Sequence, residues 1–160
     1  MKLKQNFTKK DIEIDIKQFL DPRLKLLLPA LNYLGIEFVS KARTATVLVT
    51  TKKPLEYPHS PTGFYDLSAN LRSSIGYVIL DGNTKKEEDF MQFGDGSKGK
   101  ATGLEKGIEV AKQYKGLKLV VVAGMEYATY VEAKGYDVIT NSIPLKSHVE
   151  AVIKQFTELK

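Results

Sequence analysis

Apolar residues recur at intervals of three and four early in the chain, and this run constrains the fold most. Its members are Leu24, Leu27, Leu28, Leu31, Leu34, Phe38 and Ala42. The spacing predicts an amphipathic helix of about five turns. Asp21 stands in the N-cap position and Pro22 in the first helical position, while Pro29 is expected to kink the helix or divide it. A helix with one apolar face needs a second layer to cover it.

Short segments typical of strands and helices alternate along the rest of the 160 residues. Expected strands occupy 11–16 (a strand or an extended arm), 44–50, 76–83, 117–124 and 136–140. Expected helices occupy 67–74, with Asp66 as its cap, 103–115, 125–135 and 142–156. The order lacks the regular spacing of βαβ units. We therefore predict a single α+β domain over 1–160, in which a long N-terminal helix and a C-terminal helix pack a small, mostly antiparallel sheet.

Two polar segments interrupt this pattern and are predicted to be loops. Residues 51–63 hold Pro54, Pro58 and Pro61, which favour an extended conformation. Residues 84–102 are glycine-rich and mixed in charge, and we expect a flexible loop or a hairpin insertion there.

The charge balance raises the question of nucleic-acid binding. The net charge is +5, and the one clear basic cluster lies in the first ten residues. Such a cluster can steer a protein toward nucleic acid or an acidic partner. Only three of the 24 basic residues are arginines, the residue that base and phosphate recognition favours. A solvated lysine-rich surface is the simpler interpretation, and a basic nucleic-acid-binding module stays as the alternative.

Other functional classes find little support in the sequence. The longest apolar run, 119–123, is too short for a membrane span, and the chain has no cysteine for a disulfide or a thiolate metal site. Gly94, Gly99 and Lys100 match part of a phosphate-binding loop, but Ala101 stands where a hydroxyl group is required. The two histidines, His59 and His148, are far apart and follow no metal-binding spacing. We therefore expect no enzyme, no cofactor and no membrane contact.

Two segments resemble one known family when they are taken together. "YDLSANLRSSIGYVIL", 65–80, is similar to a signature in which a (T/S)-G-N-L-R-x-S-I helix enters a strand. "VVVAGMEYATYVEAKG", 120–135, is similar to its partner, a strand leading into Y-A-x-Y-V-E-x-G. This is the pattern of the tail-completion, or head–tail connector, proteins of long-tailed bacteriophages. The motif positions are Asn70, Leu71, Arg72, Ser74, Ile75, Tyr127, Ala128, Tyr130, Val131 and Glu132.

The resemblance implies a structural role without catalysis or a cofactor. Such proteins form a ring at the virion neck, between the connector and the tail tube, after assembly in the host cytoplasm. A ring is built from head-to-tail contacts between copies, and the free chain can be a monomer. The protein would contact DNA only in the central channel of the ring. Ala69 departs from the family glycine, and Lys134 precedes Gly135 where the family often has a bulky residue.

The resemblance also suggests how the two motifs fit together. Both are helix–strand junctions, so we expect the strands near 75–80 and 118–123 to be neighbours in one sheet. Arg72 is predicted to form an ion pair with Glu132 across the junction, with Leu71, Ile75 and Tyr127 packed between the strands.

Overall fold

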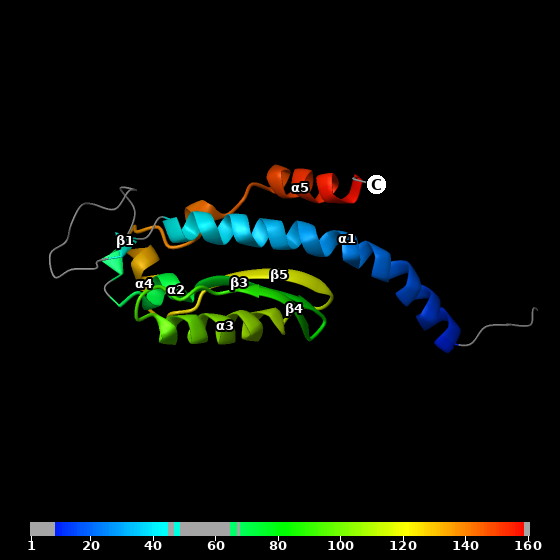
Figure 1. Ribbon diagram of the computed structural model, residues 1–160, viewed down its shortest axis with the longest axis horizontal. Coiled ribbons are helices and arrows are strands. Elements are labelled where there is room, and N and C mark those ends of the chain that lie inside the picture. The colour runs from blue at the N-terminus through cyan, green and yellow to red at the C-terminus, as the bar shows by residue number, and fades with distance from the viewer. Residues whose placement is uncertain (1–8, 45–46, 49–64, 67, 159–160) are drawn as a thin grey trace, which may run out of the picture.

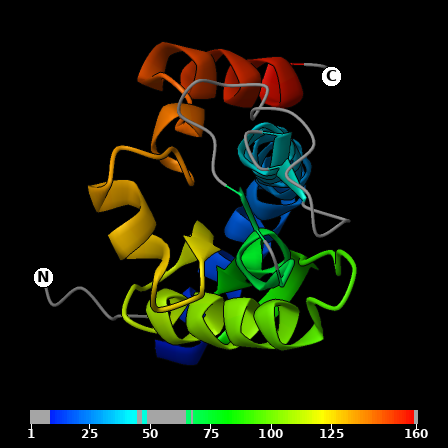
Figure 2. The same ribbon diagram turned by 90° about the vertical axis from the view of Figure 1, so that its left-hand side faces the viewer.

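The computed structural model describes residues 9–44, 47–48, 65–66 and 68–158 (Figure 1). It confirms the predicted α+β class, because helices pack on a small antiparallel sheet. Helix α1 covers one face of the sheet and α3 the other, and α5 lies on the outer side of α1 (Figures 1 and 2). The bounds of these helices are Lys9–Thr44 for α1, Ser97–Ala111 for α3 and Lys146–Glu158 for α5.

Helix α1 is longer than the sequence predicted. It runs without interruption through 11–16, Pro22 and Pro29, so the predicted strand at 11–16 and the predicted start at Pro22 are both wrong. Once a helix is nucleated, each further residue adds a hydrogen bond, whereas an isolated strand at 11–16 would need a partner. Figure 1 shows that the blue N-terminal part bends away from the rest of α1.

The three-stranded sheet has the order β4-β3-β5 and is antiparallel throughout. Its strands are β3 (Ile75–Asp81), β4 (Thr84–Asp89) and β5 (Leu117–Ala123). The predicted strands at 76–83 and 117–124 are therefore confirmed. A separate parallel pair joins β1 (Val47–Leu48) to β2 (Tyr65–Asp66), within the strand predicted at 44–50 and beside the predicted short helix.

Strand β3 lies at the centre of two apolar layers. Ile75, Tyr77 and Ile79 belong to the layer beneath α1. Val78 and Leu80 belong to the layer beneath α3. The alternation follows from the two-residue repeat of a strand, and both sets are buried because a helix covers each face. A third cluster joins α5 to α1 through Val152, Ala30 and Leu34. The predicted C-terminal helix is therefore present, but it packs mainly on α1 and not on the sheet as predicted (Figure 1).

The segment 84–102 is only partly what the sequence predicted. Its first part forms β4, the second strand of a hairpin, which agrees with the expected hairpin. Its last part is the beginning of α3, so the prediction of a flexible loop is wrong there. The buried positions of α3 are Gly99, Gly103, Gly107 and Ala111, a stripe of small residues at intervals of four. These glycines resemble a loop in sequence, but they allow α3 to lie close to its neighbours.

Three shorter helices complete the structure. They are α2 (Asn70–Ser74), α4 (Ala128–Ala133) and the 3₁₀ helix η1 (Thr140–Ser142). Helix α2 precedes β3 directly, and α4 follows β5. The predicted strand at 136–140 is wrong, because this segment passes from α4 through a turn into η1.

The packing of α3 predicts opposite effects for two glycines of the same helix. A methyl group at Gly103 would lie 2.5 Å from the carbonyl oxygen of Ser74, whereas one at Gly107 would meet Val78 at an ordinary 3.4 Å. Gly103→Ala should therefore lower the free energy of unfolding by about 2 kcal/mol through overpacking. Gly107→Ala should raise it by up to about 1 kcal/mol, because alanine favours the helix. Urea denaturation measures both, and equal effects would contradict this packing.

Candidate functional site

The two motif segments meet at one end of the sheet, as predicted. Ile75, the first residue of β3, is paired with Ala123, the last residue of β5. The N–H of Gly124 donates to the carbonyl oxygen of Ser74 at 3.1 Å, and the N–H of Met125 donates to the Ser74 hydroxyl at 3.3 Å. We call this junction of α2, β3, β5 and α4 the corner. It joins residues 51 positions apart in the sequence.

Helix α2 supports the beginning of α3 through Asn70. The Asn70 side-chain oxygen accepts a hydrogen bond from the N–H of Gly99 at 2.9 Å. This N–H lies in the first turn of α3, where the helix itself supplies no acceptor. A methyl group at Gly99 would stand 1.9 Å from the carbonyl oxygen of Asn70, so glycine is required there. Asn70 thus caps a helix that lies elsewhere in the chain.

The same contact accounts for the partial phosphate-loop motif. Gly99 lies inside α3 and packs on Asn70, and Lys100 is exposed on the same helix. The strand before this region, β4, is an antiparallel edge strand with exposed side chains. A phosphate-binding loop instead follows a buried parallel strand. The glycine spacing therefore reflects helix packing.

The turn that precedes α2 holds a non-glycine residue in a left-handed conformation. Ala69 has φ 57°, at the position where the phage family has glycine. Asp66 stabilises the turn, since its carboxylate accepts a hydrogen bond from the Arg72 N–H at 2.7 Å. Asp66 therefore binds an N–H group of the first turn, as a cap does, but the N-cap position is held by Ala69 and the helix begins at Asn70, later than predicted. Ser68 contributes a second bond by accepting from the N–H of Asn70 at 3.3 Å.

Arg72 does not form the predicted ion pair. Its guanidinium group lies over the ring of Phe93, with the central carbon 4.2 Å from the ring centroid. Burial lowers the pKa of Arg72, the charge of Arg43 lowers it further, and Asp66 opposes both. The Nε atom is buried and has no hydrogen-bond partner among the described residues. Stacking on an aromatic face, a common use of arginine, holds this side chain at the corner.

The Glu132 carboxylate forms hydrogen bonds with a different part of the chain. Its carboxylate accepts hydrogen bonds from the N–H groups of Val138, Ile139 and Thr140, at 3.1, 2.8 and 3.2 Å, and from the Thr140 hydroxyl at 2.9 Å. The pairing of Arg72 with Glu132 was therefore a wrong prediction. These bonds also explain why 136–140 forms no strand, because the carboxylate satisfies amides that a neighbouring strand would otherwise bind.

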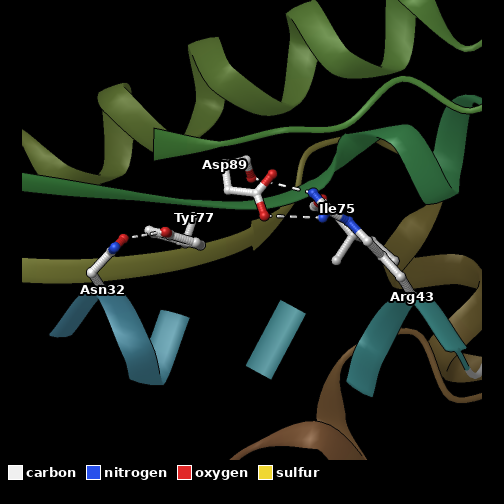
Figure 3. A network of polar contacts seen from close by, with 5 residues as sticks. All are labelled: Asn32, Arg43, Ile75, Tyr77 and Asp89. Atoms are coloured by element: carbon white, nitrogen blue, oxygen red, sulfur yellow. Dashed lines mark hydrogen bonds and ion pairs between the residues drawn. The ribbon is translucent and has the colours of Figure 1, made fainter. Parts of the chain in front are cut away.

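A second arginine, Arg43 at the end of α1, binds the corner from the other side. Its Nε and Nη2 atoms donate to the carbonyl oxygen of Ile75 at 3.1 and 2.8 Å, and Nη1 bonds the Asp89 carboxylate at 3.2 Å (Figure 3). Arg43 is 5% exposed. It links α1 to the start of β3 and the end of β4. Sequence reasoning missed this role, although an arginine in so lysine-rich a chain was an available signal.

Figure 3 also shows a second link between α1 and the sheet. The Tyr77 hydroxyl donates to the side-chain oxygen of Asn32. A methyl group at Gly35 would lie 2.8 Å from the Tyr77 ring, so the ring packs directly on the α1 backbone. Burial raises the pKa of Tyr77, and the charges of Asp89 and Glu87 raise it further.

The second motif divides between the core and the surface. Ala128 is buried, and Val131 packs against the apolar layer beneath α1. Tyr127 and Tyr130 are 40% and 63% exposed, and Tyr136 just beyond α4 is 46% exposed. The expectation that Tyr127 packs between the strands is therefore only partly met, whereas Leu71 and Ile75 are fully buried there. We call Tyr127, Tyr130 and Tyr136 the exposed tyrosines.

The structure describes one of the two histidines. His148 pairs with Glu37 at 2.8 Å on the surface, while His59 lies outside the described residues. Within the described ranges, no three histidine or acidic side chains gather as a metal site requires. None of the described helices has the length and apolar composition to cross a bilayer.

Comparison with protein families, curated proteins and solved structures found no match to this chain. The resemblance to phage head–tail proteins rests on the two motifs, and the candidate site is the corner that they build.

The left-handed conformation of Ala69 leads to a prediction for glycine. Alanine in this conformation costs roughly 1–2 kcal/mol, and glycine removes that cost while it loses one buried methyl group worth about 0.8 kcal/mol. Ala69→Gly should thus leave the free energy of unfolding unchanged or raise it by up to about 1 kcal/mol. Ala111→Gly, a control in helical conformation and equally buried, should lower it by about 1.5 kcal/mol. A larger loss for Ala69→Gly than for the control would refute the conformational argument.

The bonds of Glu132 predict a pH dependence of stability. Partial burial alone would raise the pKa of Glu132, but the hydrogen bonds from Ile139, Thr140 and Val138 outweigh burial and hold it below the ordinary value. The carboxylate therefore stabilises the fold above its ordinary pKa of about 4.3, and this contribution disappears as the pH falls through the lowered value. Glu132→Gln should be less stable than wild type near neutral pH and converge with it near about pH 3. Glu105→Gln, at an exposed site, is the control: the difference in its free energy of unfolding from wild type should be the same at every pH.

Proposed function

We propose that this chain is a structural subunit of the head–tail junction of a bacteriophage or prophage. One observation carries the proposal: the residues of two motifs, distant in sequence, assemble into a single corner. Ser74 joins the first motif to the residues that begin the second, through the bonds of its carbonyl and hydroxyl groups. Asn70, Leu71, Ile75 and Ala128 all have packing or capping roles there. A fixed corner suits a scaffold for subunit contacts.

The exposed tyrosines supply a surface for those contacts. Tyrosine is enriched in protein interfaces, where it combines apolar area with one polar group and loses little conformational freedom. Tyr127 and Tyr130 are three residues apart and so lie on the same side of α4. Their helix is fixed to the corner through Ala128 and Val131. A partner at this surface would meet a preorganised element.

In the proposed role, copies of the chain form a ring by head-to-tail contacts, between the connector and the tail tube. The ring itself need not exist in the free protein and can form only when the connector offers a template. Location at the virion neck follows, with assembly in the host cytoplasm. DNA passes through the centre of such a ring, so exposed lysines such as Lys112 and Lys115 suit a surface that faces the channel.

Complementation in the phage or prophage that carries the gene tests this role. Deletion should yield DNA-filled heads separated from tails in electron micrographs, and a plasmid copy of the wild-type gene should restore joined virions. Tyr130→Ala should fail to restore them, or restore at most about a tenth, because loss of an interface tyrosine typically costs 1 kcal/mol or more per contact. Tyr114→Ala is the matched control, since Tyr114 is 61% exposed but lies beyond α3. It should restore joined virions fully.

The same experiment has a clear negative result. Normal virions after deletion, or a gene with no virion genes beside it, would contradict the proposal. The free energy of unfolding of purified Tyr130→Ala should lie within about 0.5 kcal/mol of wild type, as is usual for substitutions at exposed sites. Tight binding of DNA by the isolated chain, falling steeply with added salt, would instead favour the nucleic-acid-binding alternative.

A further inference from the structure

Strand β5 forms an open edge of the sheet. The order β4-β3-β5 leaves one outer edge at β4 and the other at β5, and no described strand pairs with either. The sequence of β5 is "LKLVVVA", with Lys118 as its single charged residue. All seven residues are only partly buried, whereas the apolar residues of the neighbouring β3 are fully buried. An apolar edge of this length is a ready template for another strand.

The opposite edge differs sharply in chemistry. Strand β4 reads "TKKEED", and five of its six side chains are charged. Charged residues along an edge strand oppose pairing with another chain, because their desolvation is costly. The two edges are therefore not equivalent, and only β5 is suited to pairing.

A groove runs beside the open edge. It has a volume of about 530 Å³. Its apolar lining comes from Val110 of α3 and from Leu119, Val120 and Val121 of β5, and its polar lining from Tyr114, Lys115 and Lys118. The ammonium group of Lys118 donates to the carbonyl oxygen of Gly82 at 2.6 Å. The one charge of β5 is therefore bound by its own chain, which removes an obstacle to an apolar partner.

We propose that β5 pairs with β5 of a second copy, antiparallel about a two-fold axis at Val120. This register places Leu119 opposite Val121 and Lys118 opposite Val122, so no like charges face each other. The two Lys118 residues are separated by four residue steps, about 14 Å along the strands, which exceeds the screening length in physiological salt. Side chains keep their faces, since each pair joins residues of the same parity.

The pair makes one continuous six-stranded sheet, β4-β3-β5-β5-β3-β4. Both α1 helices then lie on one face and both α3 helices on the other. The outer edges are the two charged β4 strands, so association stops at the dimer. This two-fold pair is a form of the free protein and is independent of the proposed ring, whose contacts are head-to-tail.

The absence of cysteine from the chain allows a direct test of the register. Residues directly opposite in an antiparallel pair have Cα atoms about 4.5–5.5 Å apart, within the range of a disulfide. Val120→Cys should therefore form a disulfide-linked dimer under mild oxidation. Val122→Cys is the matched control, on the same strand and the same face, because its equivalent lies about 14 Å away in this register. The Val120→Cys dimer should form at least about tenfold faster, as a bound pair holds the two thiols at high effective concentration.

Sedimentation of the wild-type chain completes the test. The dimer fraction should rise with protein concentration, and Val120→Lys, which sets two ammonium groups directly opposite, should remain monomeric. Wild-type protein that stays monomeric up to about 1 mM overturns the proposal, whatever else covers β5. Equal rates of disulfide formation for the two cysteine variants also overturn it. Should Val120→Cys fail to fold by circular dichroism, the wild-type sedimentation result alone decides.

Discussion

The close approach of the α3 backbone to the corner is the contact on which the rest of the structure depends. Side chains larger than hydrogen are excluded where α3 meets α2 and the end of β5, because a methyl group at Gly124 would lie 2.4 Å from the Cα atom of Gly103. Backbone contact of this kind fixes distance and angle more tightly than interlocking side chains do. It holds α3 against the sheet, which in turn buries one face of β3. The charge network of Arg43 holds α1 against the other face.

This construction gives the motif residues separate tasks. Asn70 caps α3, Arg72 stacks on Phe93, and Glu132 binds the turn after α4. Each of these polar groups therefore stabilises the conformation of the corner. What the corner presents outward is aromatic surface, in Tyr127 and Tyr130. A protein built this way is suited to contact other subunits, which is the basis of the proposed role at the phage neck.

Periodic patterns predicted the elements whose stability is local or depends on one apolar face. The run from 24 to 42 and the apolar strands 75–81 and 117–123 led to the correct class. The pairing of these two strands was expected from the family resemblance, and the structure confirms it. Contacts between distant residues were not predictable in the same way. The glycines at the start of α3 suggested a loop, because the residues that require them are distant in sequence; Asn70, which packs on Gly99, is 29 positions away. Glu132 was assigned to a distant arginine, although amides six to eight residues ahead satisfy it.

Amide hydrogen exchange at the corner reports whether α3 and the β5–α4 junction are held against α2. The N–H groups of Gly99 and Gly124 are bonded to Asn70 and Ser74, at 2.9 and 3.1 Å. Both lie in glycine-containing segments that would exchange rapidly if α3 and the β5–α4 junction were separate from α2. If the corner holds these elements together, both amides exchange only through global unfolding, with the same protection as the centre of β3. Exchange of either amide at the rate of an exposed loop would contradict it.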